Sequence, residues 1–261
     1  MEINFITGGR LGNAIFRYLS CAIMCILYNG KYKCKKFMNT SRVYDFGEDN
    51  FKILQNAVFN NQSLEIKNVN TINMESYYQY DMIYRIFKDK IINYIKQNPN
   101  HIIETDGINA GDGRYEQFNM LSIIETPVNF NKKYTNILHV RLEDFVTHNL
   151  YLKVERVIRA LDSIQQLENN TLCIVCKTPT TDFEINYINC INKYLESKNI
   201  TAILESNDVL TDYYIMKNAE LLICSKSTLS WSAALLSTTL KTCYVPEGES
   251  FKYPIDNSHF Y

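Results

Sequence analysis

The spacing of apolar residues predicts alternating strands and helices along most of the chain. The pattern is most regular after residue 131, where short apolar runs alternate with amphipathic segments. In this second half we predict strands over 136–141, 171–176, 201–205, 221–224 and 242–245, and helices over 151–168, 183–197, 208–218 and 228–237. Strands that alternate with helices in this way predict a parallel sheet with right-handed crossovers.

The first half of the chain has a weaker pattern. In order, its residues predict a strand over 2–6, a glycine-rich turn, an apolar helix that ends at Asn29-Gly30, loops and short helices over 38–75, a helix over 80–97, a strand over 101–104, and a glycine-rich loop around Gly107, Gly111 and Gly113. We therefore expect an α/β fold of two domains, 1–130 and 131–261, of which the first is the less regular. Their ligand cleft is expected at the carboxyl ends of the strands.

The near-equal numbers of basic and acidic side chains argue against a nucleic-acid partner. The chain has 261 residues, with 27 basic and 28 acidic side chains and a formal net charge of -1. Nucleic-acid-binding domains carry a basic excess, so we expect no nucleic-acid partner. Hydrophobic residues make up 46% of the chain, a share that argues against a disordered protein.

The distribution of apolar residues also bears on localisation. No segment approaches the roughly 18 uninterrupted apolar residues of a membrane span. The first residues carry an acid, Glu2, and no basic stretch, so they are typical of a first strand and not of a signal peptide. We therefore expect a cytoplasmic protein of bacterial or viral type with no integral membrane segment.

Eight cysteines raise the question of metal or redox chemistry. Cys21 and Cys25 lie one helical turn apart in an apolar helix, and Cys173 and Cys176 lie in a strand-like run. A structural zinc site needs a second pair of ligands at suitable spacing, and none is present. We interpret these residues as reduced core thiols and expect no metal.

A first candidate site follows the predicted strand at 136–141. The segment His139-Val-Arg-Leu-Glu-Asp-Phe145 places several ionisable side chains where a strand runs out at the ligand edge of a sheet. The planar guanidinium of Arg141 suits a pair of phosphate oxygens, and Asp144 could orient it or bind a sugar hydroxyl. The alternative is an ion pair at the strand end, with His139 as a core residue.

A second candidate site is the segment Cys224-Ser-Lys-Ser-Thr-Leu-Ser-Trp231. Here a buried strand enters a cluster of hydroxyl residues that opens an apolar helix, with Ser227 or Thr228 near the N-cap. Amides and hydroxyls at a helix N-terminus form an anion site. The alternative is an ordinary N-cap, because serine and threonine are preferred there in any case.

A third segment, Thr7-Gly-Gly-Arg-Leu-Gly-Asn13, is a glycine-rich turn between a strand and a helix. It has neither the full dinucleotide fingerprint nor the P-loop spacing. Such a turn permits close approach of the backbone to a ligand, but turns of this kind are common.

Several of these segments have counterparts in one enzyme family, and they appear in the family's order. Gly9–Tyr18 is similar to G-x-L-G-N-Q-[ML]-F-Q-Y, His139–Phe145 to H-x-R-R-x-D, Asp212–Met216 to D-x-x-x-M, Ile223–Leu235 to I-x-S-N-S-[ST]-F-S-W-W-[GA]-A-W-L, and Arg114–Phe118, more distantly, to Y-F-Q-S-x-K-Y-F. The chain thus resembles the α1,2-fucosyltransferases of glycosyltransferase family 11, over residues 8–235.

The resemblance implies a GT-B-like fold in which two Rossmann-like domains face each other across a cleft. Residues 131–261 would hold GDP-fucose and residues 1–130 the glycan acceptor, and the transfer of fucose to a hydroxyl would be inverting and metal-independent. The implied roles are phosphate or guanosine contact for His139, a grip on the β-phosphate for Arg141, guanine binding for Asp212, diphosphate binding for Ser225, Ser227 and Thr228, and a border to the fucose and acceptor for Arg10 and Asn13.

The chain departs from the family pattern at three places. The family's second arginine is Leu142 here, the second tryptophan is Ser232 after Trp231, and the asparagine before the serines is Lys226. Leu142 removes a positive charge, and Lys226 supplies one nearby. These departures leave the linkage and the donor sugar open.

Sugar transfer needs stabilisation of the leaving group and a base for the acceptor hydroxyl. Arg141 with a helix N-terminus would stabilise the departing GDP electrostatically. Candidates for the base are Glu143, Asp144, Glu104 and Asp106. Two other functions stay open: a GT-B transferase that uses a different nucleotide sugar, or a catalytically degenerate module that binds a glycan or nucleotide.

Overall fold

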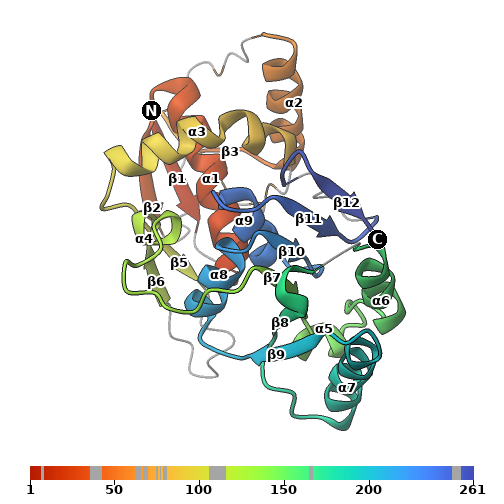
Figure 1. Ribbon diagram of the computed structural model, residues 1–261. Helices are drawn as coiled ribbons and strands as arrows, with labels where there is room; N and C mark the ends of the chain where they lie inside the picture. Colours follow the sequence, from red (N-terminus) through yellow and green to blue (C-terminus); the bar gives the residue numbers. More distant parts are fainter. Residues whose placement is uncertain are drawn as a thin grey trace. The chain divides into compact units, whose positions relative to one another are not determined.

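The computed structural model describes residues 1–6, 9–35, 43–62, 66, 70–74, 76, 78, 81–105, 116–164, 167–248 and 254–261. The chain divides into two compact units, Met1–Pro127 and Val128–Tyr261, which are described separately below. Figure 1 labels their helices and strands, with the first unit coloured red to yellow-green and the second green to blue.

Unit 1 contains a small parallel sheet and an antiparallel hairpin. Its elements are β1 (Glu2–Ile6), α1 (Leu11–Tyr28), β2 (Lys31–Lys35), β3 (Val43–Asp45), α2 (Glu48–Phe59), β4 (Thr71–Met74), α3 (Asp81–Gln97), β5 (Ile102–Thr105), β6 (Glu116–Asn119) and α4 (Met120–Ile124). The sheet has the order β2-β1-β4-β3 with every pairing parallel, and β5 pairs with β6 in antiparallel fashion.

The expectation of only loops and short helices over 38–75 was wrong in part. This stretch includes the 12-residue helix α2 and the strands β3 and β4, and β2 precedes it. The strands are short and carry polar residues where a core strand usually has apolar ones. Asn73 of β4, for example, is buried and accepts a 2.8 Å hydrogen bond from Asn4 of β1. Such satisfied polar positions hide a strand from a hydrophobic pattern.

Helix α1 forms the core of unit 1 and ends as the sequence predicts. Asn29 adopts the left-handed conformation that commonly ends a helix.

By length and composition alone, α1 could cross a membrane, and 78% of its residues are buried inside the structure, as in the core helix of a globular protein. The helix is not an uninterrupted apolar run, because Asn13 and Arg17 lie within it, and the expectation of no integral membrane segment stays a prediction.

Unit 2 is built on a six-stranded parallel sheet flanked by helices. Its elements are β7 (Asn136–His139), α5 (Glu143–Thr147), α6 (Val154–Ser163), a 3-10 turn (Glu168–Asn170), β8 (Thr171–Val175), α7 (Asp182–Ser197), β9 (Thr201–Glu205), α8 (Val209–Lys217), β10 (Leu221–Ile223), α9 (Thr228–Leu236), β11 (Thr242–Val245) and β12 (Ser258–Phe260). The α/β class that the sequence predicts is confirmed, and unit 2 is consistent with a Rossmann-like fold.

The strand order of unit 2 is that of a doubly wound sheet. The order is β12-β11-β10-β7-β8-β9, so the chain runs outward in one direction from β7 and then in the other direction from β10. Helix α6 packs on α7 and α8 packs on α9, and Figure 1 shows the two pairs on opposite sides of the sheet. The order reverses between β7 and β10, and open sheets of this type bind ligands at such a switch point.

Two predicted elements of unit 2 are shorter than expected, and one strand was missed. The helix expected over 151–168 is α6, Val154–Ser163, because Leu152 and Leu167 continue the apolar pattern from non-helical positions that are buried in the same core. The strand expected over 136–141 ends at His139. The short strand β12, which pairs with β11, was not predicted, because its Ser-His-Phe sequence lacks an apolar run.

Candidate functional site

A hydrogen bond between His139 and Ser225 marks the switch point of unit 2. Leu138 of β7 pairs with Ile223 of β10, so the residues that follow these strands emerge side by side. His139 Nδ1 and Ser225 Oγ share a 2.8 Å hydrogen bond, and both side chains are buried. Burial lowers the pKa of His139 to about 4, so the imidazole is neutral near pH 7. His139 therefore joins the two segments as a neutral group.

Arg141 lies at the same edge and contacts two carboxylates. Its Nη1 atom lies 2.8 Å from Glu143 Oε2, and its Nη2 atom lies 2.9 Å from Asp144 Oδ1. The side chain is 17% exposed, and its guanidinium lies over the Phe145 ring, 5.6 Å from the centroid. The strand-end ion pair that the sequence left as an alternative is thus present. It orients the guanidinium at the ligand edge and keeps some of it open to solvent.

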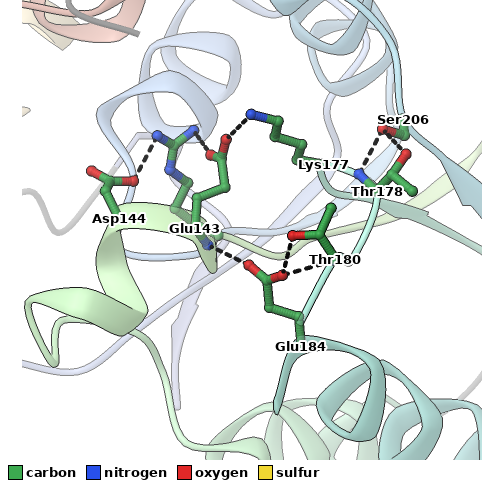
Figure 2. Close-up of polar contacts among 8 residues, drawn as sticks. Glu143, Asp144, Lys177, Thr178, Thr180, Glu184 and Ser206 are labelled. Atoms are coloured by element: carbon green, nitrogen blue, oxygen red, sulfur yellow. Dashed lines mark hydrogen bonds and ion pairs between the residues drawn. The ribbon is translucent and has the colours of Figure 1, made fainter. Parts of the chain in front are cut away.

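Glu143 is held in place by two neighbouring segments of the chain. Its backbone has a φ of 36°, in the left-handed region that residues other than glycine rarely adopt. Its amide donates to Glu184 Oε1 at 3.2 Å, and its own carboxylate lies 3.1 Å from Lys177 Nζ. Figure 2 shows Lys177 reaching the Glu143 carboxylate, with the Glu184 carboxylate below.

The carboxylate of Glu184 joins the segment after β7 to the segment after β8. Its Oε2 atom accepts from the amides of Thr180 (2.9 Å) and Thr181 (3.0 Å), and Thr181 completes a capping box at the start of α7. Burial alone would raise the pKa of Glu184, but these hydrogen bonds outweigh it and hold the pKa below its usual value. The residue is therefore an ionised anchor for both segments.

The segment after β9 reaches the same area. The Thr178 amide and hydroxyl contact Ser206 Oγ at 2.8 Å and 2.9 Å, and Figure 2 shows this pair beside Lys177. The segments after β7, β8 and β9 are thus cross-connected by polar contacts, which fixes the side chains that they present at the carboxyl edge of the sheet.

The serine-rich segment forms the start of α9. Ser227 is the N-cap, and its side chain accepts a hydrogen bond from the Leu229 amide at 3.3 Å. Thr228 is the first helical residue and Ser225 is buried in front of the cap. The ordinary N-cap that the sequence left as an alternative is therefore present. The aligned peptide dipoles of α9 still give this end of the helix the partial positive charge that favours anions.

The two predicted segments meet around one small pocket. The pocket is lined in part by His139, Arg141, Phe145, Ser225 and Lys226, and its cavity volume is about 10 Å³, room for about one water molecule. Ligand pockets commonly measure about 300–1,000 Å³. A diphosphate would therefore bind at the mouth of this pocket, against the side chains that line it, and not inside it. Arg141 and Lys226 bring positive charge to the pocket from the two sides of the switch point.

Asp212 lies elsewhere at the carboxyl edge, in a polar network after β9. Asn207 Nδ2 donates to Asp212 Oδ1 at 3.0 Å and to Glu205 Oε2 at 2.9 Å, and Lys132 Nζ lies 2.7 Å from the same Glu205 oxygen. Burial raises the pKa of Asp212 to about 6. Burial alone would raise the pKa of Glu205. Hydrogen bonds from Lys132, Tyr134 and Asn207 outweigh it and lower this pKa to about 2. The predicted guanine acceptor is thus only partly ionised below pH 6.

The structure gives the positions of the predicted site residues Arg10, Asn13 and Glu104 within unit 1. Arg10 precedes α1 and Asn13 lies in its first turn. Glu104 lies in β5 and accepts a 2.8 Å hydrogen bond from Gln117 of β6. The remaining base candidate, Asp106, lies outside the described residues, as do Thr7, Gly8 and the first two residues of the segment Arg114–Phe118.

The cysteines named in the sequence analysis are buried thiols. Cys21 and Cys25 lie in the core of unit 1, and burial raises the pKa of both. Burial likewise raises the pKa of Cys173 and of Cys176 to about 12. Among the residues that the structure describes, no group of three or more His, Cys, Asp and Glu side chains is placed to hold a metal ion.

The polar cluster around Arg141 contains Glu143, Asp144, Lys177 and Glu184, and two of these residues, Lys177 and Glu184, were not identified from the sequence. Lys177 directly follows the predicted strand 171–176, so the strand-end argument that selected Arg141 applies to it as well. Glu184 is the last residue of Thr181-x-x-Glu184, a capping-box pattern just before an amphipathic helix. The pattern indicates the cap but gives no sign of the contact with Glu143.

Comparisons of the chain with protein-family models, curated proteins and solved structures find no match. The likeness to the fucosyltransferases therefore rests on the motif residues themselves.

Proposed function

We propose that the chain is a glycosyltransferase that moves L-fucose from GDP-fucose to a glycan hydroxyl, with inversion, without a metal and with α1,2 linkage. The observation that carries this proposal is the convergence of two motif segments at the switch point of unit 2. Arg141 and Lys226, which come from different segments, line the same pocket, and His139 and Ser225 form a hydrogen bond beside them. This is the position at which a doubly wound sheet binds a nucleotide.

In the proposed reaction, unit 2 binds the donor. Arg141 contacts the β-phosphate, and the amides of the first turn of α9, with Ser227 and Thr228, contact the other diphosphate oxygens. Negative charge builds on the diphosphate as the bond to fucose breaks. A fixed guanidinium and oriented amides stabilise that charge more in the transition state than in the bound donor, and each such donor is worth about 3–4 kcal/mol.

The base takes the proton from the acceptor hydroxyl. Glu143 and Asp144 are the two carboxylates in contact with Arg141, so either would lie near the reacting centre of a donor bound to that residue. We further propose that the two units face each other in the GT-B manner. Unit 1 would then supply the acceptor side, with Arg10 and Asn13 bordering the fucose.

Leu142 favours one alternative, a transferase that uses another nucleotide sugar. At this position the fucosyltransferase pattern has an arginine, and here the side chain is buried in the hydrophobic core of unit 2. Position 142 therefore supplies no charge to a donor. A change of base or sugar would be compatible with the diphosphate contacts that remain.

A ligand-induced thermal shift separates these readings. The protein is melted with GDP or UDP in the presence of EDTA, alongside the Arg141→Ala variant and an Arg159→Ala control, which removes an exposed arginine on α6. GDP should raise the Tm of the wild type and of the control but not of Arg141→Ala. Stabilisation by UDP and not by GDP would overturn the fucose donor, and equal stabilisation of Arg141→Ala would overturn the site. Binding without any transfer or donor hydrolysis would instead favour a binding module.

A further inference from the structure

One carboxylate, that of Glu143, bridges two cations that come from neighbouring strands. Glu143 Oε2 lies 2.8 Å from Arg141 Nη1, and Glu143 Oε1 lies 3.1 Å from Lys177 Nζ. Figure 2 shows Lys177 reaching this carboxylate from the segment after β8. The spacing of the two cations thus fits a single anion that offers one oxygen to each.

The two cations also occupy equivalent places in the sheet. His139, the last residue of β7, pairs with Val175, the last residue of β8. Arg141 and Lys177 each lie two residues beyond these ends. The parallel register therefore brings both side chains to the same carboxyl edge, where the first turns of the following segments present ligand-binding groups.

We propose that Lys177 is a second diphosphate-binding cation and that the Glu143 carboxylate occupies the place of a phosphate group until the ligand binds. The proposal rests on the proposed function for the identity of the nucleotide, but the anion site itself requires only a diphosphate. When the ligand enters, two phosphate oxygens replace the two oxygens of Glu143. Arg141 keeps its second contact, with Asp144, throughout.

The cluster has the properties that such an exchange requires. The Lys177 side chain is 69% exposed, and ion pairs with so much solvent access contribute little to stability, so the Lys177–Glu143 pair can be given up at small cost. The Arg141–Glu143 pair is more buried, at 17% and 24% exposed, so its loss must be offset by the contact that a phosphate oxygen makes with the same guanidinium. The two cations pair directly with the carboxylates of Glu143 and Asp144, whereas the nearby Glu184 carboxylate is held by backbone amides. Displacement of Glu143 uncovers positive charge only when an anion is there to receive it.

Both cations keep unused donors for the ligand. A guanidinium and an ammonium group each carry more N–H donors than these ion pairs use. The guanidinium is planar and is held by Asp144, whereas the ammonium sits on a flexible stem. Arg141 therefore supplies a fixed contact, and Lys177 supplies one that adjusts to the phosphate.

Direct titration with inorganic pyrophosphate and with GDP tests the proposal. Lys177→Met should weaken the affinity for both probes about tenfold, the value of one lost hydrogen bond to a charged group, and Lys177→Arg should restore most of it. Lys241→Met is the matched control, because Lys241 is 72% exposed and pairs with Glu220 at 2.6 Å, but at the amino ends of β10 and β11. This control should bind both probes like the wild type.

Glu143→Gln tests the displaced carboxylate. Removal of the competing charge should tighten pyrophosphate binding several-fold, whereas unchanged or weaker binding would show that Glu143 is not displaced. If Lys177→Met binds pyrophosphate as tightly as the wild type, Lys177 has no role in diphosphate binding. The proposal is also overturned if the wild type binds no diphosphate. If pyrophosphate binding responds as expected but GDP binds no better than UDP, the cation pair stands and the GDP-fucose proposal fails.

Discussion

The 2.8 Å hydrogen bond between His139 Nδ1 and Ser225 Oγ joins the strands on the two sides of the switch point in unit 2. Because the pair is buried, it sets the spacing between the segment that carries Arg141 and the segment that opens α9. A diphosphate at this edge would contact both segments, so its binding depends on a fixed distance between them.

The protonation of His139 should make the stability of the protein fall in mild acid. The folded-state pKa is about 4, whereas an unperturbed histidine titrates near 6.5. Between these values the unfolded chain binds a proton that the folded chain does not. The contribution of neutral His139 to the free energy of unfolding is thus fully present above pH 6.5. The free energy of unfolding falls by roughly 3 kcal/mol as the pH falls toward 4.

The His139→Asn variant isolates this contribution, because the amide has no titration in the range and can still reach Ser225. Denaturant unfolding of both proteins at pH 7 and at pH 4.5 gives the comparison. The fall in the free energy of unfolding between the two pH values should be smaller in the variant by about 2–3 kcal/mol. The same fall in both proteins would contradict a buried, neutral His139.

Glu184 should affect both stability and turnover, and Thr181 only stability. Glu184→Ala removes the acceptor for the Glu143 amide as well as for the amides of Thr180 and Thr181, which costs about 1–3 kcal/mol of stability. It also frees the strained turn that places Glu143. Thr181→Ala removes only the cap of α7, at about 1 kcal/mol.

Unfolding experiments and initial rates on the two variants separate these effects. Turnover by Glu184→Ala should fall at temperatures where the variant is fully folded, and Thr181→Ala should keep wild-type turnover. Equal turnover in the two folded variants would mean that Glu184 acts only as a helix cap.

Restoring the family's second arginine should damage this protein. Leu142 packs in the core of unit 2 with Leu138, Leu152 and Val157, so Leu142→Arg would bury a charge without a partner and cost several kcal/mol. Leu142→Met is the conservative control, with a loss below about 1.5 kcal/mol. Thermal melting measures both changes. A Leu142→Arg variant as stable as the wild type and more active would show that position 142 faces the donor.

Asp212 should lower the stability of the folded protein above pH 6 and should contribute to nucleotide binding. Because burial raises its pKa to about 6, the folded chain holds a proton there that the unfolded chain loses above the usual aspartate value. Its effect on the free energy of unfolding therefore becomes less favourable as the pH rises from about 4 through 6. Asp212→Asn should be more stable than the wild type at pH 8 and should bind GDP more weakly. Unchanged GDP affinity across this substitution would remove Asp212 from the guanine site.

The elements of unit 2 could be predicted because burial dictates their pattern. Strands such as Thr171–Val175 have a neighbouring strand on each side in a parallel sheet and are apolar on both faces, and the helices show one apolar stripe. In unit 1, β4 buries the polar residue Asn73, so hydrophobicity alone did not reveal this strand. Strand β2 alternates lysine with apolar residues, a strand-like period that was overlooked because it spans only five residues.

The candidate site could be predicted only where sequence neighbours or strand ends determine it. Arg141 and Asp144 lie three positions apart, and their contact follows from that spacing. The contacts of Glu143 with Lys177 and Glu184 join segments more than 30 residues apart. They depend on strand register and on the direction of a capping side chain, which no local pattern reports.

Release of GDP from GDP-fucose, measured with EDTA and a panel of glycan acceptors, tests the central claim most directly. The wild type and the Arg159→Ala control should release GDP in step with fucosylation of an acceptor, without added metal. Arg141→Ala should be slower by roughly 10²–10³-fold or more, the loss expected for one donor that stabilises transition-state charge. Wild-type turnover by Arg141→Ala, or an absolute need for a divalent cation, would contradict the account.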